Sequence, residues 1–423
     1  MRASSIDIHP NAKWAKNGIT VAGGNRWGSG TNQLYRPNGL YVDDDQTIYV
    51  ADWRNHRILE WKSGATNGKI VAGGNGQGNG AHQLKCPMDV IIDKESDSLI
   101  ISDWWNKRVV RWPRRNGTRG QTIISNISCF GLTMDENGYL YVVHNEEHEV
   151  RRYKIGDTKG TVVAGGNGKG NRLDQLSQPH FVFVDRDHSV YVSDCENHRV
   201  MKWEEGAKQG IVVASGQGQG NSLTQLHWPQ GVLVDQMGTV YVTDFGNHRI
   251  MRWPKGATQG NVIIGGNGEG AQSNQLNTPI GLSFDRHGNL YLVDYGNHRV
   301  QKFNIVGTRL LLIRENYDII LYDAQQKRSL TKVRPKLDGK DCWEKLTFIY
   351  LQDQIPMLLG DLLETNLHAN LILTPCPRSQ QELKQTRRVL NVCEKNTIDE
   401  HPLNYDEYNP FNICAASYVP HLS

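Results

Sequence analysis

The sequence predicts an all-β protein built mainly as a six-bladed β-propeller, and three recurring features support this prediction. The first is the motif Asp-x-x-Asn-His-Arg, which occurs at Asp52–Arg57, Asp194–Arg199, Asp244–Arg249 and Asp294–Arg299. Weakened copies stand at Asp103–Arg108, where Lys107 replaces the histidine, and at His144–Glu149. Copies that recur at intervals of about 50 residues in most cases indicate a repeat protein in which each unit packs on its neighbours.

The other two features frame this motif in every copy. The first expected strand of each copy ends in an aspartate: Asp43, Asp93, Asp135, Asp185, Asp235 and Asp285. The third expected strand ends, or nearly ends, in an aromatic residue: Trp61, Trp112, Tyr153, Trp203, Trp253 and Phe303. Large aromatic side chains at one recurring position are well suited to fill the wedge between adjacent sheets.

The copy at Pro229–Leu276 shows how one unit is built. Gly231–Asp235 and Val240–Asp244 are short β-rich runs, as are Ile250–Trp253 and Val262–Ile264, and glycine-containing turns separate them. Four such strands form one antiparallel sheet that is too small to bury both of its faces. Six sheets that lean on one another in a ring solve this problem, which is the architecture of a propeller.

The start of the chain is expected to close this ring. The sixth copy, Pro279–Phe303, has three strands and no fourth, whereas Gly18–Asn25 reads like the fourth strand in Lys69–Asn75. We therefore expect Ile19–Ala22 to pair beside Arg299–Lys302, which removes two free sheet edges. A chain that starts after Gly24 should be much less stable.

The repeat also has a family likeness. The spacing Asp-x-x-Asn-His-Arg after a Leu-Tyr-Val-type strand, with Pro-x-Gly-Leu/Val before it, resembles the NHL repeat family over roughly residues 18–303. The resemblance implies a propeller that serves as an interaction or RNA-binding module. It divides the chain into an N-terminal lead (1–17), the propeller (18–303) and a C-terminal appendix (304–423).

Two recurring polar features are interpreted as structural. The Gly-rich loops, such as Gly265–Leu276, resemble phosphate-binding loops, but no Lys-Ser/Thr follows and no helix is set up. The histidines of the motif, for example His248, occur once per blade, so they form a ring and cannot converge on one metal ion. The aspartate and arginine of the motif are expected to hold the turn between strands two and three.

Function is expected where the copies differ. The residues before or at the start of strand one and those of the turn after strand two should share one face around the central channel. The first group comprises Asn38, Met88, Phe130, His180, Gln230 and Ile280. From the second group we single out Trp53, Trp104, Trp105, Phe245 and Tyr295. An aromatic patch on one rim is typical of a binding surface, although these rings could instead only cover the channel mouth.

The third copy is irregular and suggests a second kind of site. His144 replaces the strand-two aspartate, and His180 begins the neighbouring copy on the same face. Two histidines with nearby carboxylates could hold a metal or act as base and acid, as in a lyase or hydrolase. Metal sites need three or four convergent ligands, so drift in a redundant repeat is the preferred interpretation, and we expect no metal and no cofactor.

The second copy carries a run of basic residues with no acid between them: Lys107, Arg108, Arg111, Arg114, Arg115 and Arg119. Such a run is a candidate patch for phosphate, RNA or an acidic protein. A solvated blade edge is the alternative interpretation.

Composition restricts the class of protein. The chain has 423 residues, a net charge of +3 and seven cysteines, and it contains no Cys-x-x-Cys pair that would predict a zinc ribbon. No apolar run reaches transmembrane length, and Met1–Trp14 has no apolar signal-peptide core. We therefore expect a soluble, cytoplasmic protein without a membrane span.

The chain changes character after Phe303, where glycine becomes rare. Leu310–Leu330, Leu337–Leu346 and Lys384–Pro420 resemble pieces of the alpha chain of coatomer. The first piece reads as strands without partners, and Pro356–Asn370 and Gln380–Glu394 are compatible with helices. The segment is therefore expected to be a partly ordered, partly helical appendix, through which coat proteins could bind.

The leading functional hypothesis is a non-catalytic module that binds a protein or another extended ligand on its loop face. The alternatives are an RNA-binding NHL module, a metal-dependent lyase or hydrolase with a site at the channel mouth, and a coatomer-like component of vesicle transport. The last alternative depends on the C-terminal segment alone.

Overall fold

A computed structural model describes Ile8, residues 12–306 and four later strands, which cover 310–315, 318–323, 328–333 and 350–351. The chain divides into two compact units, Met1–Ile305 and Val306–Ser423. The first unit contains six four-stranded antiparallel sheets, so the predicted six-bladed propeller is confirmed.

The blades follow one another along the chain. Blade I consists of β3 (Leu40–Val42), β4 (Ile48–Asp52), β5 (Arg57–Trp61) and β6 (Lys69–Gly73). Blade II consists of β7 (Pro87–Asp93), β8 (Ser98–Asp103), β9 (Arg108–Pro113) and β10 (Gln121–Ser125). Blade III consists of β11 (Cys129–Met134), β12 (Tyr139–His144), β13 (Glu149–Lys154) and β14 (Thr161–Gly165).

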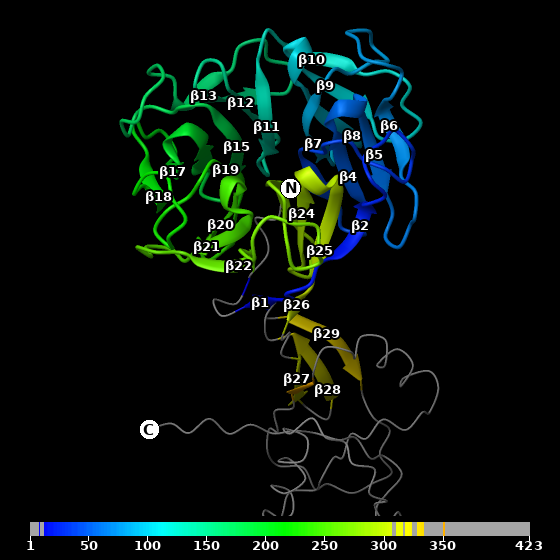
Figure 1. Cartoon of the computed structure of the whole chain (residues 1–423), viewed down its shortest axis with the longest axis vertical. Helices are drawn as coiled ribbons and strands as arrows, with labels where there is room; N and C mark the ends of the chain where they lie inside the picture. The colour runs from blue at the N-terminus through cyan, green and yellow to red at the C-terminus, as the bar shows by residue number, and fades with distance from the viewer. Residues whose placement is uncertain are drawn as a thin grey trace, which may run out of the picture. The chain divides into compact units, whose positions relative to one another are not determined.

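The remaining blades repeat the pattern. Blade IV consists of β15 (Pro179–Val184), β16 (Val190–Asp194), β17 (Arg199–Trp203) and β18 (Ile211–Ser215). Blade V consists of β19 (Pro229–Val234), β20 (Val240–Asp244), β21 (Arg249–Trp253) and β22 (Asn261–Gly265). Blade VI consists of β23 (Pro279–Phe284), β24 (Leu290–Asp294), β25 (Arg299–Phe303) and the N-terminal β2 (Ile19–Gly23). In Figure 1 the first strands, such as β7, β11 and β15, lie toward the centre of the ring, and the fourth strands lie outside.

The N-terminal strand closes the ring as predicted. β2 pairs antiparallel with β25, with Ile19 opposite Lys302 and Ala22 opposite Val300. In Figure 1 the blue strand β2 lies beside the yellow-green strand β25. The first and last parts of the propeller sequence therefore share one sheet, and the edge of β25 that would otherwise be free is paired.

The aspartate at the end of strand one, which in most blades directly follows the strand, holds the next turn. In blade V, Asp235 Oδ1 accepts the backbone N–H groups of Met237 and Thr239 at 2.9 Å, and Oδ2 accepts the Tyr241 hydroxyl at 3.0 Å. Burial raises the pKa of Tyr241, so the phenol stays a donor. The recurring aspartate is thus explained by turn geometry.

The aromatic residue of strand three packs between blades as expected. Trp253 is 1% exposed, and the six residues at this position are all buried. Gly260, which precedes the fourth strand, lies against this ring, because an added Cβ would stand 2.7 Å from it. The same contact recurs between Gly210 and Trp203 at 2.9 Å. These blades therefore need a glycine there to seat the aromatic side chain.

The N-terminal lead contains more structure than the sequence suggested. β1 (Lys13–Trp14) pairs with β26 (Ile305–Val306). Trp14 is 5% exposed, donates its Nε1–H to the Gly288 carbonyl at 2.9 Å and stacks on Phe284 with ring centroids 6.1 Å apart. Ile8, Ala12 and Trp14 of the lead are therefore part of the core of the first unit.

The second unit is described only through its strands. β27 (Leu310–Glu315), β28 (Asp318–Asp323), β29 (Arg328–Val333) and β30 (Tyr350–Leu351) form one sheet in the order β29-β28-β27-β30. The expectation that Leu310–Leu330 lacks partner strands was wrong, because β27 and β28 pair with each other and β28 also pairs with β29. The two segments predicted to be helical lie outside the described residues. In the part of the chain that is described, no helix is long and apolar enough to span a membrane.

Candidate functional site

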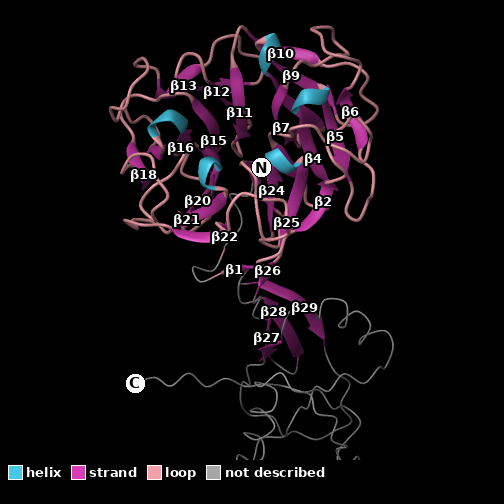
Figure 2. Cartoon of the chain, in the orientation of Figure 1, coloured by secondary structure: helices cyan, strands magenta, loops and turns pink. Residues whose placement is uncertain are grey.

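The turn after strand two is built by the Asp-Asn-Arg part of the motif. It forms a short 3-10 helix in five blades: η1 (Trp53–Asn55), η2 (Trp104–Asn106), η3 (Cys195–Asn197), η4 (Phe245–Asn247) and η5 (Tyr295–Asn297). These helices, cyan in Figure 2, are distributed around the ring. The face that carries them is called the loop face below.

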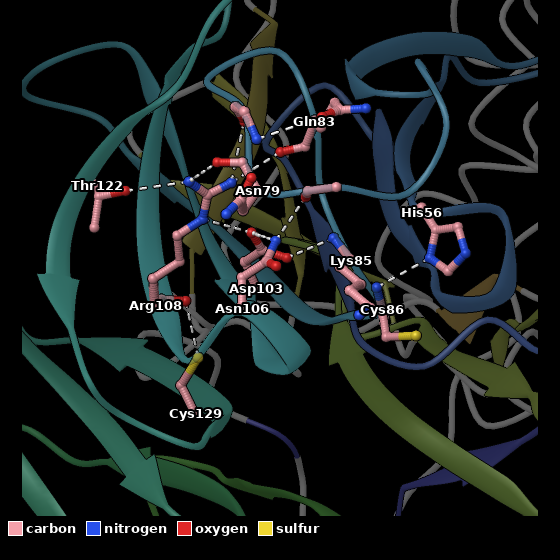
Figure 3. A network of polar contacts seen from close by, with 12 residues as sticks. His56, Asn79, Gln83, Lys85, Cys86, Asp103, Asn106, Arg108, Thr122 and Cys129 are labelled. Carbon is pink, nitrogen blue, oxygen red and sulfur yellow. Dashed lines mark hydrogen bonds and ion pairs between the residues drawn. The ribbon is translucent and has the colours of Figure 1, made fainter.

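Figure 3 shows this network in blade II. Asp103 Oδ2 accepts Arg108 Nε at 2.7 Å and Asn106 Nδ2 at 2.8 Å, while Oδ1 accepts the backbone N–H of Lys85 at 2.6 Å. The guanidinium of Arg108 also donates to the carbonyls of Asn79 at 2.9 Å and Gln83 at 3.0 Å. One buried carboxylate thereby fixes the turn and the Gly-rich loop together, which supports the structural interpretation of both.

The motif histidines join each blade to the next. The backbone N–H of Cys86 donates to His56 Nδ1 at 3.1 Å, and the N–H of Arg36 donates to His298 Nδ1 at 3.1 Å across the ring closure. Burial lowers the pKa of His56 and His298, and neighbouring cations lower it further. The neutral imidazole is the form that can accept this bond. Blade II lacks the imidazole for such a link, because Lys107 replaces the histidine.

Residues from all six blades converge on a cavity of about 390 Å³ at the mouth of the channel on the loop face. The six strand-start residues Asn38, Met88, Phe130, His180, Gln230 and Ile280 all line it. His180 is half-buried and the other five are buried. A cavity of this volume with mainly apolar and aromatic walls has the size and lining of a ligand site.

The rings around the mouth form two arcs. On blades II to IV, Trp104 contacts Phe130 edge to face at 5.3 Å between centroids, and Phe130 stacks on His180 at 4.6 Å. On the opposite side, Trp53, Tyr295, Phe245 and Trp228 follow one another at centroid distances of 6.4, 6.5 and 6.4 Å. Because each ring rests on its neighbour, the rim is pre-ordered for contact with a ligand.

One wall of the cavity is polar. His180 Nδ1 lies 2.6 Å from Gln230 Oε1, and Gln230 Nε2 donates to Cys195 Sγ at 3.3 Å. This orientation of the amide assigns the imidazole proton to Nδ1 and leaves Nε2 as an acceptor. Burial lowers the pKa of His180 and raises that of the Cys195 thiol to about 12. The wall therefore offers a neutral acceptor, and its cysteine is a protonated thiol at neutral pH.

Trp53 forms part of the opposite wall of the cavity. Its indole Nε1 is buried and has no hydrogen-bond partner among the described residues, so this N–H does not face the open cavity. The cavity thus combines apolar and aromatic surface with one polar wall at His180 and Gln230.

The sequence-predicted site residues are largely brought together. Ten of the eleven residues singled out line the cavity. The exception is Trp105, which is 52% exposed and contacts Trp104 edge to face, with ring centroids 5.9 Å apart. Comparison of the copies missed Gln178 and Trp228, which line it as well, and Cys195 and Glu196, which occupy the compared turn of the fourth copy, also line it. Gln178 and Trp228 occupy a position that also varies between copies, so the criterion of disagreement between repeats could have found them.

The structure does not assemble the two histidines into a metal centre. His144 Nδ1 lies 3.7 Å from Glu149 Oε1, whereas His180 is engaged by Gln230. Among the residues that the structure describes, no group of three or more His, Cys, Asp or Glu side chains could hold a metal ion.

The basic run of blade II is not a free patch. Lys107 pairs with Glu146 at 2.7 Å, Arg108 with Asp103 at 2.7 Å and Arg115 with Asp97 at 3.1 Å. Arg111 pairs with Asp93 at 3.4 Å, and Arg114 pairs with Asp43. The carboxylates come from other strands and from other blades, so the sequence run could not reveal them. Of the six residues, only Arg119 has no carboxylate partner among the described residues.

Comparison with models of known protein families finds two matches in this chain. The model "NHL repeat" matches residues 34–61, 176–203, 226–252 and 276–303, which are copies one, four, five and six. A second model, for the C-terminus of the coatomer (COPI) alpha subunit, matches residues 362–422, which lie outside the described residues. Coatomer subunit alpha-2 of Arabidopsis thaliana is 38% identical over 52 residues, 12% of this chain and 4% of that protein. The chain therefore spans only a small fraction of this relative.

Two solved structures share the fold. A structural genomics protein of unknown function from Bacteroides thetaiotaomicron VPI-5482 has a TM-score of 0.56 at 15% identity, over 69% of this chain and 76% of that one. An auxiliary nutrient binding protein from the same organism has a TM-score of 0.51 at 16% identity, over 70% and 77%. At this identity the likeness extends to the fold alone.

Proposed function

We propose that this chain, an NHL-repeat protein whose repeats form a six-bladed β-propeller, is a non-catalytic module that binds a protein segment in the channel mouth. The observation that supports the proposal is the cavity of about 390 Å³, to which every blade contributes a strand-start residue. The rigid ring holds these side chains in fixed positions, so little conformational entropy is lost on binding.

The chemistry of the cavity favours binding over catalysis. A nucleophile or base needs a perturbed group placed against a reacting atom, and the Cys195 thiol is protonated at neutral pH because burial raises its pKa to about 12. The aromatic rims instead supply large, rigid contact area, which is the usual composition of binding hot spots.

The test is selection of 12-residue peptides from an unbiased display library on the full chain. We expect enriched peptides whose binding is lost in Ile280→Trp, which fills the cavity, and weakened in Trp228→Ala, which removes an exposed rim ring. The same peptides should still bind a variant altered on the opposite face, Met237→Trp. The proposal is wrong if no peptide is enriched, or if the enriched peptides bind both cavity variants unchanged while circular dichroism shows them folded.

A second candidate function concerns the C-terminal segment. The match of residues 362–422 to the coatomer alpha C-terminus supports association with coat proteins through this segment. We expect coat proteins to co-purify with the full chain. They should not co-purify with a shortened chain that ends at Phe303. Equal recovery of coat proteins with both chains would contradict this proposal and leave the proposed role of the cavity untouched.

A further inference from the structure

The charges around the mouth are unevenly distributed. Arg36 and Arg54 are exposed and Lys85 is half-buried, and none of the three has a carboxylate partner among the described residues. By contrast, the two acids at the turns of blades III and IV are neutralised, because Glu146 pairs with Lys107 and Glu196 pairs with Lys169, each at 2.7 Å. These three unpaired positive charges thus lie on one side of the mouth.

Each of these three cations lies over an aromatic ring of the rim. The guanidinium carbon of Arg54 is 4.3 Å from the Trp53 ring centroid, that of Arg36 is 5.6 Å from Tyr295, and the ammonium of Lys85 is 5.0 Å from Trp105. Cation–π contacts hold the charges in place without neutralising them. The three cations with Trp53, Trp105 and Tyr295 are called the cationic arc below; its rings come from blades I, II and VI.

The arc is continuous with the cavity. Trp53 and Tyr295 line the cavity and carry Arg54 and Arg36 on their rings. Arg54 and Lys85 both lower the pKa of His56, so the two charges lie around the same imidazole at the junction of blades I and II. An extended ligand that fills the cavity and continues out of it across the cationic arc would meet the three positive charges in succession.

We propose that the cationic arc selects an extended acidic peptide whose single large apolar side chain anchors in the cavity. This inference rests on the proposed binding function and specifies its partner. Met88, Phe130 and Ile280, which line the cavity, accept the apolar anchor. Carboxylates on one side of the anchor then face Arg36, Arg54 and Lys85.

The distribution of charge favours a peptide over a single-stranded nucleic acid. A nucleic acid needs a basic groove that follows its backbone together with successive stacking platforms. Here the positive charge covers one arc, and Glu146 and Glu196 stand at the mouth on blades III and IV. On that side a phosphate chain that crossed the mouth would meet charges that are already paired, Glu146 with Lys107 and Glu196 with Lys169, whereas a short acidic segment ends at the three unpaired cations.

The experiment compares the full chain with a charge-reversed variant, Arg36→Glu/Arg54→Glu/Lys85→Glu, in the same display selection at physiological salt. For the native protein we expect peptides with two or three Asp or Glu residues on one side of an aromatic or aliphatic residue. Synthetic copies of these peptides should bind the reversed variant at least about tenfold more weakly. Replacing their acids by Asn and Gln should cause a similar loss on the native protein.

The matched control reverses three exposed lysines that do not line the cavity, Lys62→Glu/Lys154→Glu/Lys208→Glu, and should bind the peptides unchanged. Selected peptides without acidic bias that still require the cavity would overturn this inference and leave the proposed function standing. If no selected peptide required the cavity for binding, both this inference and the proposed function would be wrong. Tight, salt-sensitive binding of a labelled 12-nucleotide oligouridine, lost in the charge-reversed variant, would replace the peptide by RNA.

Discussion

The junctions between blades and the channel mouth use the repeat in opposite ways. At the junctions the same residue types return in most copies, as in the carboxylate–guanidinium pairs Asp52–Arg57 and Asp244–Arg249, both at 2.7 Å. At the mouth, equivalent positions hold an amide in Asn38, a thioether in Met88 and an imidazole in His180. The same turns position both sets of residues. Only the junction positions keep one residue type in most copies, whereas the mouth positions vary in side-chain chemistry.

The contrast shows where a repeat protein can vary. A junction residue contacts a partner that most blades provide, so a change of residue type breaks a contact of known geometry. A mouth residue faces the cavity, where its side chain meets residues from other blades or a ligand. Stability is therefore concentrated in the repeated positions and recognition in the varied ones.

The largest effect should come from opening the ring. Removing residues 1–24 deletes β2 and β1, so that β25 loses its partner strand and Trp14 leaves the core. We expect the shortened chain to lose the cooperative unfolding transition of the propeller or to unfold at a much lower urea concentration. Urea unfolding followed by far-UV circular dichroism measures this. A midpoint equal to that of the full chain would contradict the closed ring.

Two tryptophans of blade V separate the two regions directly. Trp253→Ala should cost about 3–5 kcal/mol of unfolding free energy, because it empties a buried site between blades. Trp228→Ala, at a side chain that is 45% exposed on the rim, should change the unfolding free energy by no more than about 0.5 kcal/mol. The contrast is measured by urea unfolding of both variants. Similar costs at the two positions would show that the mouth also stabilises the ring.

The motif carboxylate offers a finer test. Asp244→Asn preserves shape but replaces the charged acceptor of Arg249 Nε and Asn247 Nδ2. We expect a loss of about 1.5–3 kcal/mol, the range for hydrogen bonds to charged groups. Asp174→Asn, which alters a surface pair with Arg172, is the control and should cost less than about 1 kcal/mol. Equal losses in the two variants would argue against the role of the network.

The smallest effect is a pH dependence of the junctions. The pKa values of His56, His148, His198 and His298 are lowered in the folded protein, chiefly by burial. The unfolded chain therefore binds protons first, and the unfolding free energy, complete above a pH of about 6.5, falls as the pH decreases below that value. Protonation also removes the Nδ1 acceptor that the backbone N–H of Trp228 uses at 3.2 Å on His198.

Urea midpoints at pH 7.5 and 5.5 measure this dependence. The native chain should be less stable at pH 5.5, and His198→Gln should reduce the difference, whereas the exposed His82→Gln should not. An identical pH difference in all three proteins would show that the junction histidines do not cause it.

The sequence predicted the features that recur and missed those that occur once. Periodic comparison located the blades, the closing strand and the buried Trp203 and Trp253, because each had equivalents to align. It also predicted most of the cavity, since the same comparison marks positions that vary. It could not predict the packing of Trp14, which has no counterpart in another copy.

The sequence also could not predict ion pairs between residues that lie far apart in the chain. The basic run of blade II seemed free of acids only along the chain, whereas Arg114 pairs with Asp43 of the preceding blade. At the mouth, by contrast, Arg36, Arg54 and Lys85 have no carboxylate partner among the described residues. These three are separated in sequence and come together at the mouth through the fold. Which cations lack partners is a property of the three-dimensional structure.

The pairing of β2 with β25 also sets an order for biosynthesis. The first strand of the propeller leaves the ribosome long before Arg299–Phe303, the strand with which it pairs. At ordinary translation speeds, the interval is roughly 15–60 s. During that time blades I to V can stack on one another, while Ile19–Gly23 presents an edge that other nascent chains could capture. Slow codons or a chaperone acting late in synthesis would therefore affect this protein at one step, the joining of its two ends.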